Sequence, residues 1–162
     1  YKVIDIAHAA GVKVVLNPAP ACEIPEDVIG KIDIVTPNET EAQVLTGVEV
    51  KTKEDAERAA KVFFDKGVKN VVITMGALGA FASDGQKSEL LPRLKVDAID
   101  STGAGDAFNG GFLMALSEGK DLFTALRYGN ATGALSVTKL GTAPAMPHRA
   151  EIDAMVKENY GI

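Results

Sequence analysis

The sequence has only one cysteine, Cys22, among its 162 residues. A single cysteine cannot form an intrachain disulfide, which fits a reducing compartment, so we expect a cytoplasmic protein. No apolar run approaches the roughly 20 residues that span a bilayer. Positive charge is also scarce, since 17 Lys and Arg stand against 22 Asp and Glu, a formal net charge of -5. This balance argues against nucleic acid or an anionic membrane as partner, so an anionic substrate would need a local device such as aimed backbone N–H groups.

The start of the chain lacks both an initiator methionine and a signal-peptide pattern. Instead, Ile4, Ile6 and Ala7 belong to the apolar face of a predicted buried helix that ends at Gly11. A sequence that opens inside a helix favours a fragment of a longer protein, with a processed chain as the alternative.

The length fits one domain with one hydrophobic core, and we find no repeat and no internal boundary within residues 1–162. Strands alternating with helices predict an α/β fold with a mostly parallel sheet and helices on its faces. A hairpin turn is expected at Asp84-Gly85. Strands are expected at 12–16, 32–35, 71–73, 80–82, 88–91 and 94–99, and helices at 25–29, 38–46, 52–66, 106–118, 121–137 and 148–159.

The segment from Asp100 to Gly110, with the sequence DSTGAGDAFNG, follows a predicted strand and leads into a predicted helix. Gly103 and Gly105 permit a tight turn whose N–H groups lie where the helix dipole favours negative charge. Such amides are suited to stabilise a phosphoryl group during transfer. Asp106, at the helix entrance, is a candidate acceptor for the proton of an attacking hydroxyl.

A purely structural interpretation of this segment stands beside the catalytic one. An aspartate at a helix start is a favoured N-cap, worth about 1 kcal/mol, and glycines before it can simply shape the turn. The segment is not a Walker A loop, because no Gly-Lys-Ser/Thr follows. Nor is it a dinucleotide fingerprint, since Phe108 occupies the place of the third glycine, which counts against a nicotinamide-dependent oxidoreductase.

Two other places have a simple structural explanation beside a functional one. Asn38 and Glu41 have the spacing of a capping box at a helix start. Thr74, with Gly76 and Gly79, follows a predicted strand, where ligands of open α/β sheets bind, but the three residues also suit an ordinary tight turn.

The segment DSTGAGDAFNG resembles the C-terminal signature of the ribokinase/PfkB carbohydrate kinases. Further segments resemble ribokinase in the same order, namely Asn17-Pro-Ala-Pro-Ala, Thr36-Pro-Asn-Glu-Thr-Glu-Ala and Thr74-x-Gly76-x-x-Gly79. Family enzymes transfer the γ-phosphoryl group of ATP to a sugar hydroxyl. The Asn17-Pro-Ala-Pro-Ala segment favours ribokinase over fructokinase-like relatives.

The resemblance implies a role for each matching residue. Asp106 would be the catalytic base, and Gly103, Ala104 and Gly105 would supply anion-hole amides. Glu41 would order Mg²⁺, largely through water, beside its capping role. Nucleotide contacts would come from Asn38, Thr74, Gly76, Gly79 and Asn130, although a mid-helix asparagine such as Asn130 can also face solvent or bond to the backbone.

The resemblance also implies a monovalent cation of the potassium type, which shapes the anion hole in the family. Ala145 departs from the family pattern, because ribokinases commonly have a serine there whose hydroxyl can reach the ion. We therefore expect a weakened site or a water in its place. The matching ligand positions are Asp100, Thr102, Ser136, Lys139 and Gly141.

The likeness covers only about the C-terminal half of a ribokinase. It implies a partial ribokinase-like, Rossmann-like three-layer fold without the N-terminal half and the β lid, which hold most of the sugar contacts. We therefore expect little or no sugar-kinase activity from this chain alone, and either self-association or association with the missing half. A stand-alone ATP- or ADP-binding module with a structural or regulatory role is the alternative.

Overall fold

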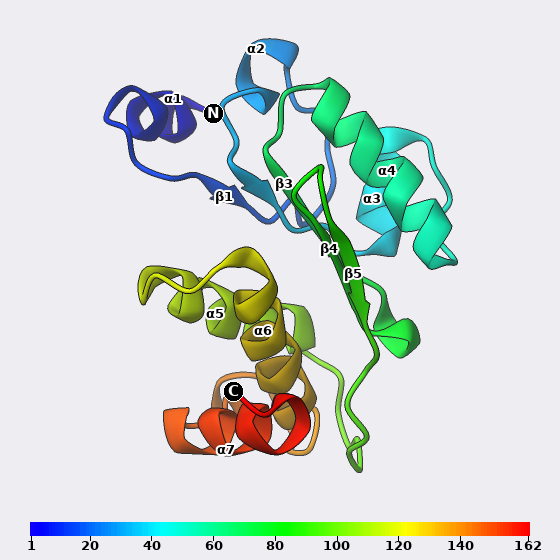
Figure 1. Ribbon diagram of the computed structural model, residues 1–162, viewed down its shortest axis with the longest axis vertical. Helices are drawn as coiled ribbons and strands as arrows, with labels where there is room; N and C mark the ends of the chain where they lie inside the picture. Colours follow the sequence, from blue (N-terminus) through cyan, green and yellow to red (C-terminus); the bar gives the residue numbers. More distant parts are fainter. The chain divides into compact units, whose positions relative to one another are not determined.

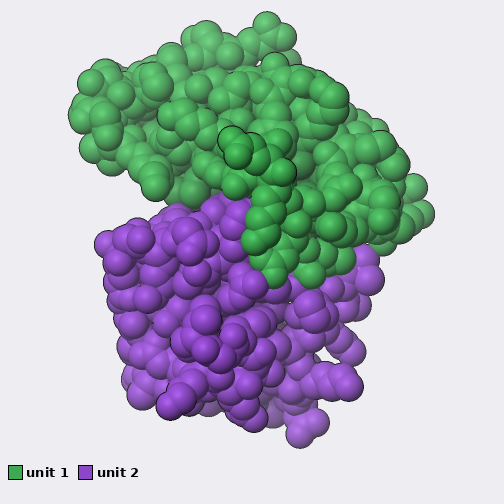
Figure 2. Space-filling model, viewed as in Figure 1, with its two compact units in different colours: residues 1–76, 81–90 green, residues 77–80, 91–162 purple.

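The computed structural model describes all residues of the chain, 1–162, in seven α-helices, five β-strands and two short 3-10 helices (Figure 1). The residues form two compact units, which Figure 2 shows in separate colours. The first comprises Tyr1–Gly76 and Phe81–Leu90, and the second comprises Ala77–Ala80 and Leu91–Ile162. Organisation of the whole chain as one domain stays a prediction.

Five short strands form one sheet in the order β1-β2-β3-β4-β5. The first three strands run parallel, with Val15 opposite Ile34 and Val35 opposite Val71. This confirms the predicted α/β fold with a mostly parallel arrangement. The turn expected at Asp84-Gly85 is also present, where the Asp84 N–H donates to the Lys87 carbonyl at 3.2 Å. The strand bounds are Val15–Leu16 (β1), Ile34–Val35 (β2), Asn70–Thr74 (β3), Ala80–Ser83 (β4) and Ser88–Leu91 (β5).

Helices α3 and α4 lie beside β3 in the first unit (Figure 1). Both begin where the sequence predicts, with capping boxes at Asn38 and Thr52. Gly47 ends α3 in the left-handed conformation, at φ 75°. The α4 face that the sequence predicts to be apolar is buried, including the fully buried Phe63. The four helices of this unit are α1 (Lys2–Ala9), α2 (Glu26–Ile29), α3 (Glu39–Thr46) and α4 (Lys53–Asp65).

Two sequence-based expectations for the first unit are wrong. Helix α1 has no buried residue, and Ile6 is 59% exposed, because no element of the chain covers that face. Only Ile4 and Ala7 pack partly against the core. The first strand begins at Val15 instead of residue 12, and Val12 is exposed.

The second unit is helical and contains α5 (Ala104–Ser117), α6 (Leu122–Ser136) and α7 (Arg149–Tyr160). Helices α5 and α6 pack so closely that Gly111 has no room for a side chain: a Cβ there would lie only 2.0 Å from the Thr132 hydroxyl. Phe108 and Phe112 stack on the same face of α5 with ring centroids 6.1 Å apart. No helix in either unit is both long enough and apolar enough to cross a membrane.

The strand predicted at 94–99 is absent from the second unit. The N–H groups of Ile99 and Asp100 instead donate to the Val137 carbonyl, at 2.7 and 3.2 Å, just past the end of α6. Residues 94–99 have the alternating apolar pattern of a strand, but they do not pair with another strand.

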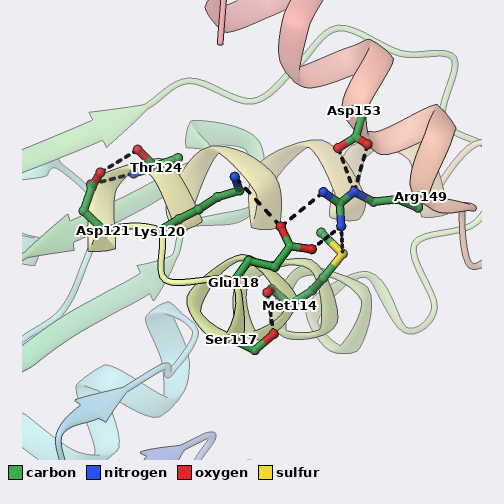
Figure 3. Close-up of polar contacts among 8 residues, drawn as sticks. All are labelled: Met114, Ser117, Glu118, Lys120, Asp121, Thr124, Arg149 and Asp153. Atoms are coloured by element: carbon green, nitrogen blue, oxygen red, sulfur yellow. Dashed lines mark hydrogen bonds and ion pairs between the residues drawn. The ribbon is translucent and has the colours of Figure 1, made fainter.

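Arg149, the first residue of α7, binds the residue that follows α5 (Figure 3) and also lies near α6. Its guanidinium donates to both carboxylate oxygens of Glu118, which follows α5, and to Asp153 in α7 at 2.8 Å. It also lies 5.9 Å from the ring centroid of Tyr128 in α6. The Lys120 ammonium lies 5.2 Å from the same centroid. One guanidinium thus holds α7 against the end of α5.

Candidate active site

The carboxyl ends of β1, β2 and β3 meet at one edge of the sheet, and the polar residues that follow these strands meet there too. The Asn17 amide, after β1, donates to the Thr36 carbonyl, after β2, at 2.9 Å. Asn38 and Thr74 form an isolated parallel bridge, and the Thr74 N–H donates to the Pro37 carbonyl at 3.0 Å. Three segments that are distant in the sequence therefore share the edge where ligands of α/β sheets bind.

The capping box at the start of α3 has both of its hydrogen bonds. Asn38 Oδ1 accepts from the Glu41 N–H, and Glu41 Oε2 accepts from the Asn38 N–H, each at 2.8 Å. Capping uses only one polar atom of each side chain. Asn38 Nδ2 and Glu41 Oε1 have no partner within the chain, so the structure leaves one donor and one acceptor for a ligand at this edge.

The turn after β3 depends on its glycines. Gly76 has φ 47° and Gly79 has φ 112°, which L side chains rarely adopt. A Cβ on Gly76 would lie 3.1 Å from Glu39 Oε1, and a Cβ on Gly79 would lie 2.0 Å from the Leu91 carbonyl oxygen. Gly79 is therefore required for close packing of the backbone, whereas Gly76 is exposed beside the start of α3.

Helix α5 begins two residues earlier than predicted, because Gly103 is its N-cap, with φ 76°. No side chain caps this end of the helix. The Ala104 N–H donates to the Ser101 carbonyl at 3.2 Å, whereas the N–H groups of Gly103, Gly105 and Asp106 have no partner within the chain. Unpaired amides at a helix N-terminus form a ready-made anion site.

Asp106 lies in the first turn of α5 and does not act as the N-cap that the structural interpretation requires. Its side chain is exposed and makes no hydrogen bond or ion pair within the chain. A carboxylate without a partner, one turn from unpaired amides, is free to accept a proton from a bound hydroxyl. The sequence-based alternative of a helix cap is therefore wrong.

The Asp100 carboxylate ties the segment before α5 to the segment after α6. Its oxygens accept from the N–H groups of Thr102 at 2.9 Å and Gly141 at 3.0 Å. The Thr102 hydroxyl, followed by these two N–H groups, lowers the pKa of the Asp100 carboxyl from its ordinary 3.8 to about 2. Thr142 packs against Gly103, where a Cβ would lie 3.1 Å from its methyl carbon.

The expected monovalent-cation ligands fit this arrangement in part. The Asp100 carboxylate brings the backbone N–H groups of Thr102 and Gly141 together, so two of the expected segments meet at one carboxylate. The side chains of Ser136 and Lys139 are used elsewhere, donating to the Gly133 carbonyl at 2.8 Å and to Glu151 at 3.3 Å. Only their backbone carbonyls could serve an ion, as the resemblance implies.

Asn130 is nearly buried in the middle of α6, with 8% of its surface exposed. Its Nδ2 donates to the Pro92 carbonyl at 2.9 Å and to the Tyr160 hydroxyl at 2.8 Å. The NH₂ group of the amide is therefore bound inside the second unit, and its Oδ1 has no hydrogen-bond partner within the chain.

Comparison with known proteins decides the family. The model of the pfkB family carbohydrate kinases matches residues 1–149. The chain belongs to this family. Its match to a ribokinase of Haemophilus influenzae has 53% identity over 147 residues and covers 91% of this chain but 48% of that protein. The chain spans about half the length of the curated relatives it matches.

Solved structures agree with this family membership. A ribokinase of Arabidopsis thaliana complexed with ribose and ATP matches with a TM-score of 0.90 and 34% identity, over 96% of this chain and 51% of that one. An E. coli structure in complex with ATP and Mg²⁺ matches with a TM-score of 0.80 and 29% identity, over 98% and 53%. The partial ribokinase-like fold expected from the sequence is thus confirmed.

The residues that match the family motifs form two sets, one in each compact unit. The structure brings together Asn38, Glu41, Thr74 and Gly76 in the first unit, and the residues around the start of α5 in the second. Gly79 and Asn130 also belong to the second unit, with contacts of their own. The second set is Asp100, Thr102, Gly103, Ala104, Gly105, Asp106 and Gly141.

Sequence reasoning missed several residues that shape these sets. Glu39 lies beside Gly76, and Thr142 lies against Gly103. Pro92 and Tyr160 bind Asn130 from 38 and 30 residues away. No local pattern links positions so far apart in the sequence, and only the Glu39 position, inside a family motif, carried a usable signal.

Proposed function

We propose that the chain carries the ATP site, the anion hole and the catalytic base of an ATP-dependent sugar kinase of the ribokinase type. The reaction would convert D-ribose to ribose 5-phosphate. One observation supports this most strongly: the N-terminus of α5 presents unpaired amides next to the exposed, unpaired Asp106 carboxylate. Helix capping alone requires neither feature.

The proposed chemistry follows from these groups. The sugar hydroxyl oxygen forms a bond to the γ-phosphorus of ATP, and the bond from that phosphorus to the bridging oxygen of ADP breaks. Negative charge on the equatorial oxygens is stabilised by the N–H groups of Gly103 and Gly105. The hydroxyl proton passes to Asp106 as the new bond forms.

Each compact unit would offer its own groups to the nucleotide. In the first unit, the Asn38 amide, Thr74 and the exposed backbone of Gly76 would be offered to the phosphates; in the second, Asn130 would be offered to the base, with Gly79 shaping the turn. Glu41 Oε1 would hold Mg²⁺ through water, in keeping with the reluctance of that ion to lose its water ligands. Mg²⁺ would neutralise charge on the phosphates. A monovalent cation would take Asp100 and the carbonyls of Thr102, Ser136, Lys139 and Gly141, without a side-chain oxygen from Ala145.

The remaining half of the relatives would supply the sugar contacts and act as the partner of this chain. Phosphoryl transfer needs the acceptor hydroxyl in line with the γ-phosphorus, and misplacement by about 1 Å can cost roughly 100-fold in rate. The chain alone should therefore bind nucleotide without appreciable turnover.

A coupled ADP-release assay with ribose tests this proposal, using the chain alone and the chain mixed with the unmatched half of the Haemophilus influenzae ribokinase. We expect negligible turnover from the chain alone and clear turnover from the mixture. Asp106→Asn in the mixture should lower kcat by about 100-fold or more. Turnover of the chain alone in the usual kinase range, about 1–100 per second, would contradict the expected dependence on a partner.

The alternative, a binding module with a structural or regulatory role, gives a different result. The chain would bind ATP or ADP, yet the mixture would release no ADP with ribose. Retention of full activity by Asp106→Asn would also remove the case for a catalytic base.

A further inference from the structure

The start of α5 differs from the starts of α3, α4 and α6. Asn38, Thr52 and Asp121 cap those three helices, each with a side-chain oxygen that accepts a backbone N–H at a distance between 2.8 and 3.2 Å. No side chain binds the N–H groups at the start of α5. The first turn of this helix therefore keeps its amides unpaired, but it also lacks the restraint that a cap supplies.

The absence of a cap matters because Gly105 lies in that first turn. A Cβ at Gly105 would have no heavy atom within 4 Å, so no neighbouring side chain packs against this residue. Glycine also has more backbone freedom than any other residue and weakens helices. The peptide between Gly105 and Asp106, which carries the unpaired Asp106 N–H, therefore needs another source of order.

Asn109 restrains this peptide from its carbonyl side. The side-chain NH₂ of Asn109 donates to the Gly105 carbonyl, one turn back along α5, at 2.9 Å. The Gly105 carbonyl and the Asp106 N–H belong to one planar peptide unit, so a bond that holds the oxygen also fixes the direction of the N–H. The same bond polarises the peptide and strengthens its N–H as a donor.

A purely local interpretation of this bond can be judged against a second asparagine in the same unit. Asn159 donates to the Met155 carbonyl, four residues back in α7, also at 2.9 Å. The N–H of that peptide, from Val156, lies inside α7, where it belongs to the hydrogen-bond ladder of the helix. In α7 the bond only satisfies the asparagine, whereas in α5 it acts on a peptide whose N–H is unpaired.

We propose that Asn109 is a positioning residue of the anion hole, which replaces a helix cap by binding the carbonyl side of the first turn and leaving the N–H side free. The inference rests on the proposed function, in which amides at the start of α5 stabilise the transferring phosphoryl group. A conventional cap would compete with that anion for the same N–H donors. Asn109 orders the turn without this competition, and the Asp106 N–H joins those of Gly103 and Gly105 as a donor to the γ-phosphate.

The first test measures dissociation constants of the full chain for Mg²⁺-ATP and Mg²⁺-ADP by isothermal titration calorimetry. Asn109→Ala should weaken ATP binding by about fivefold and leave ADP, which lacks the γ-phosphate, unchanged. Asn109→Thr should restore most of the ATP affinity, because a threonine hydroxyl can bond to the carbonyl four residues back, as Thr132 does to Tyr128 at 2.7 Å. Asn159→Ala removes the equivalent bond from α7 and is the matched control, which should bind both nucleotides like the unmodified chain.

A second pair of measurements separates positioning from stability. Alanine has a higher helix propensity than asparagine, so Asn109→Ala should not lower the thermal midpoint of the chain. NMR relaxation of the nucleotide-free chain should show lower order parameters for the amides of Gly105 and Asp106 in this variant. Asn159→Ala should leave the order of both amides unchanged.

The outcomes distinguish this inference from the proposed function. Unchanged ATP affinity in Asn109→Ala, equal losses for ATP and ADP, or unchanged order at Asp106 would overturn the inference while nucleotide binding stands. A lowered thermal midpoint together with equal losses would assign Asn109 a structural role only. If the unmodified chain binds neither nucleotide, the proposed function fails and the inference fails with it.

Discussion

Two aspartates near the start of α5 differ in what holds their carboxylates. Asp106 has no partner within the chain, which suits a group that must accept a proton. Asp100 accepts two backbone N–H groups, from Thr102 and Gly141, and its pKa is lowered to about 2. The first residue is left available for chemistry, and the second joins the segments on either side of α5 and α6.

The lowered pKa of Asp100 predicts a pH-dependent contribution to stability. The folded carboxyl binds its proton more weakly than the unfolded one, whose pKa is near the ordinary 3.8. The contribution is therefore complete above about pH 4 and is lost as the pH falls through about 2. Asp100→Asn should lower the urea midpoint at neutral pH, and its deficit relative to the unmodified chain should shrink between about pH 4 and pH 2.

Urea titrations of the two proteins across that range check this prediction, since the other acidic groups are common to both and cancel in the difference. Asp106→Asn is the matched control, because its carboxyl has no partner to lose, and it should track the unmodified chain. A deficit for Asp100→Asn that stays constant down to about pH 2 would contradict the assigned role.

At the scale of elements, the helices of the second unit are joined by the Arg149 guanidinium. It binds Glu118 and Asp153 (Figure 3) and lies over the ring of Tyr128. The planar fork of arginine matches a carboxylate with two hydrogen bonds, which lysine cannot do. The contact therefore depends on shape as well as on charge.

We predict that Arg149→Ala lowers the thermal midpoint by a few degrees, with Arg149→Lys recovering only part of the loss. Lys61→Ala is a suitable control, because Lys61 makes a single exposed ion pair with Asp65 at 2.8 Å, of a kind that contributes little. Differential scanning calorimetry measures all three. Full recovery by Arg149→Lys would show that charge alone matters at this position.

The elements that sequence patterns predicted well are those whose ends are decided locally. The caps at Asn38 and Thr52 and the left-handed glycine after α3 act within one turn of the chain. The segment 94–99 has strand-like alternation, but a strand also needs a partner, and alternation says nothing of pairing. The burial expected for helix α1 is wrong for a similar reason. An apolar face is buried only where another element covers it, and the pattern of the sequence does not show whether one does.

The candidate site also combines features that the local sequence predicts with features that depend on distant residues. The glycines and Asp106 could be identified from one contiguous segment that resembles a family motif. Which amides are unpaired could not, because the turn that uses the Ala104 N–H depends on where α5 begins. The Tyr160 contact could not be foreseen either, because it joins residues that only the packing of α6 and α7 brings together.

At the scale of the whole molecule, apolar surface and an unpaired strand edge lie close in sequence. The strand β1 is at the edge of the sheet and pairs only with β2. Val3, Ile6 and Val12 on either side of the first turn are 78%, 59% and 58% exposed. An exposed strand edge with apolar neighbours favours association with another chain.

We predict that the chain self-associates at micromolar concentration, or pairs with the unmatched half of a relative when that half is supplied. Sedimentation velocity should show species larger than a monomer, and the double substitution Val3→Lys with Ile6→Lys should shift the distribution towards the monomer. Val44→Lys serves as control, since Val44 is 62% exposed on α3, away from this surface. A single monomeric species for the unmodified chain would refute the prediction.

The glycine contacts between α5 and α6 have a consequence for the length of ligand that the proposed ATP site would accept. Neither helix can shift past the other, since Gly111 has no room for a Cβ beside Thr132, and one at Gly129 would lie 3.0 Å from the Phe108 ring. The close packing of α5 and α6 therefore fixes the distance between Asp106 and Asn130. Under the proposed function, a nucleotide that contacts both residues would have to match this separation, so a phosphate chain longer or shorter by one unit would leave one of the two contacts unmade.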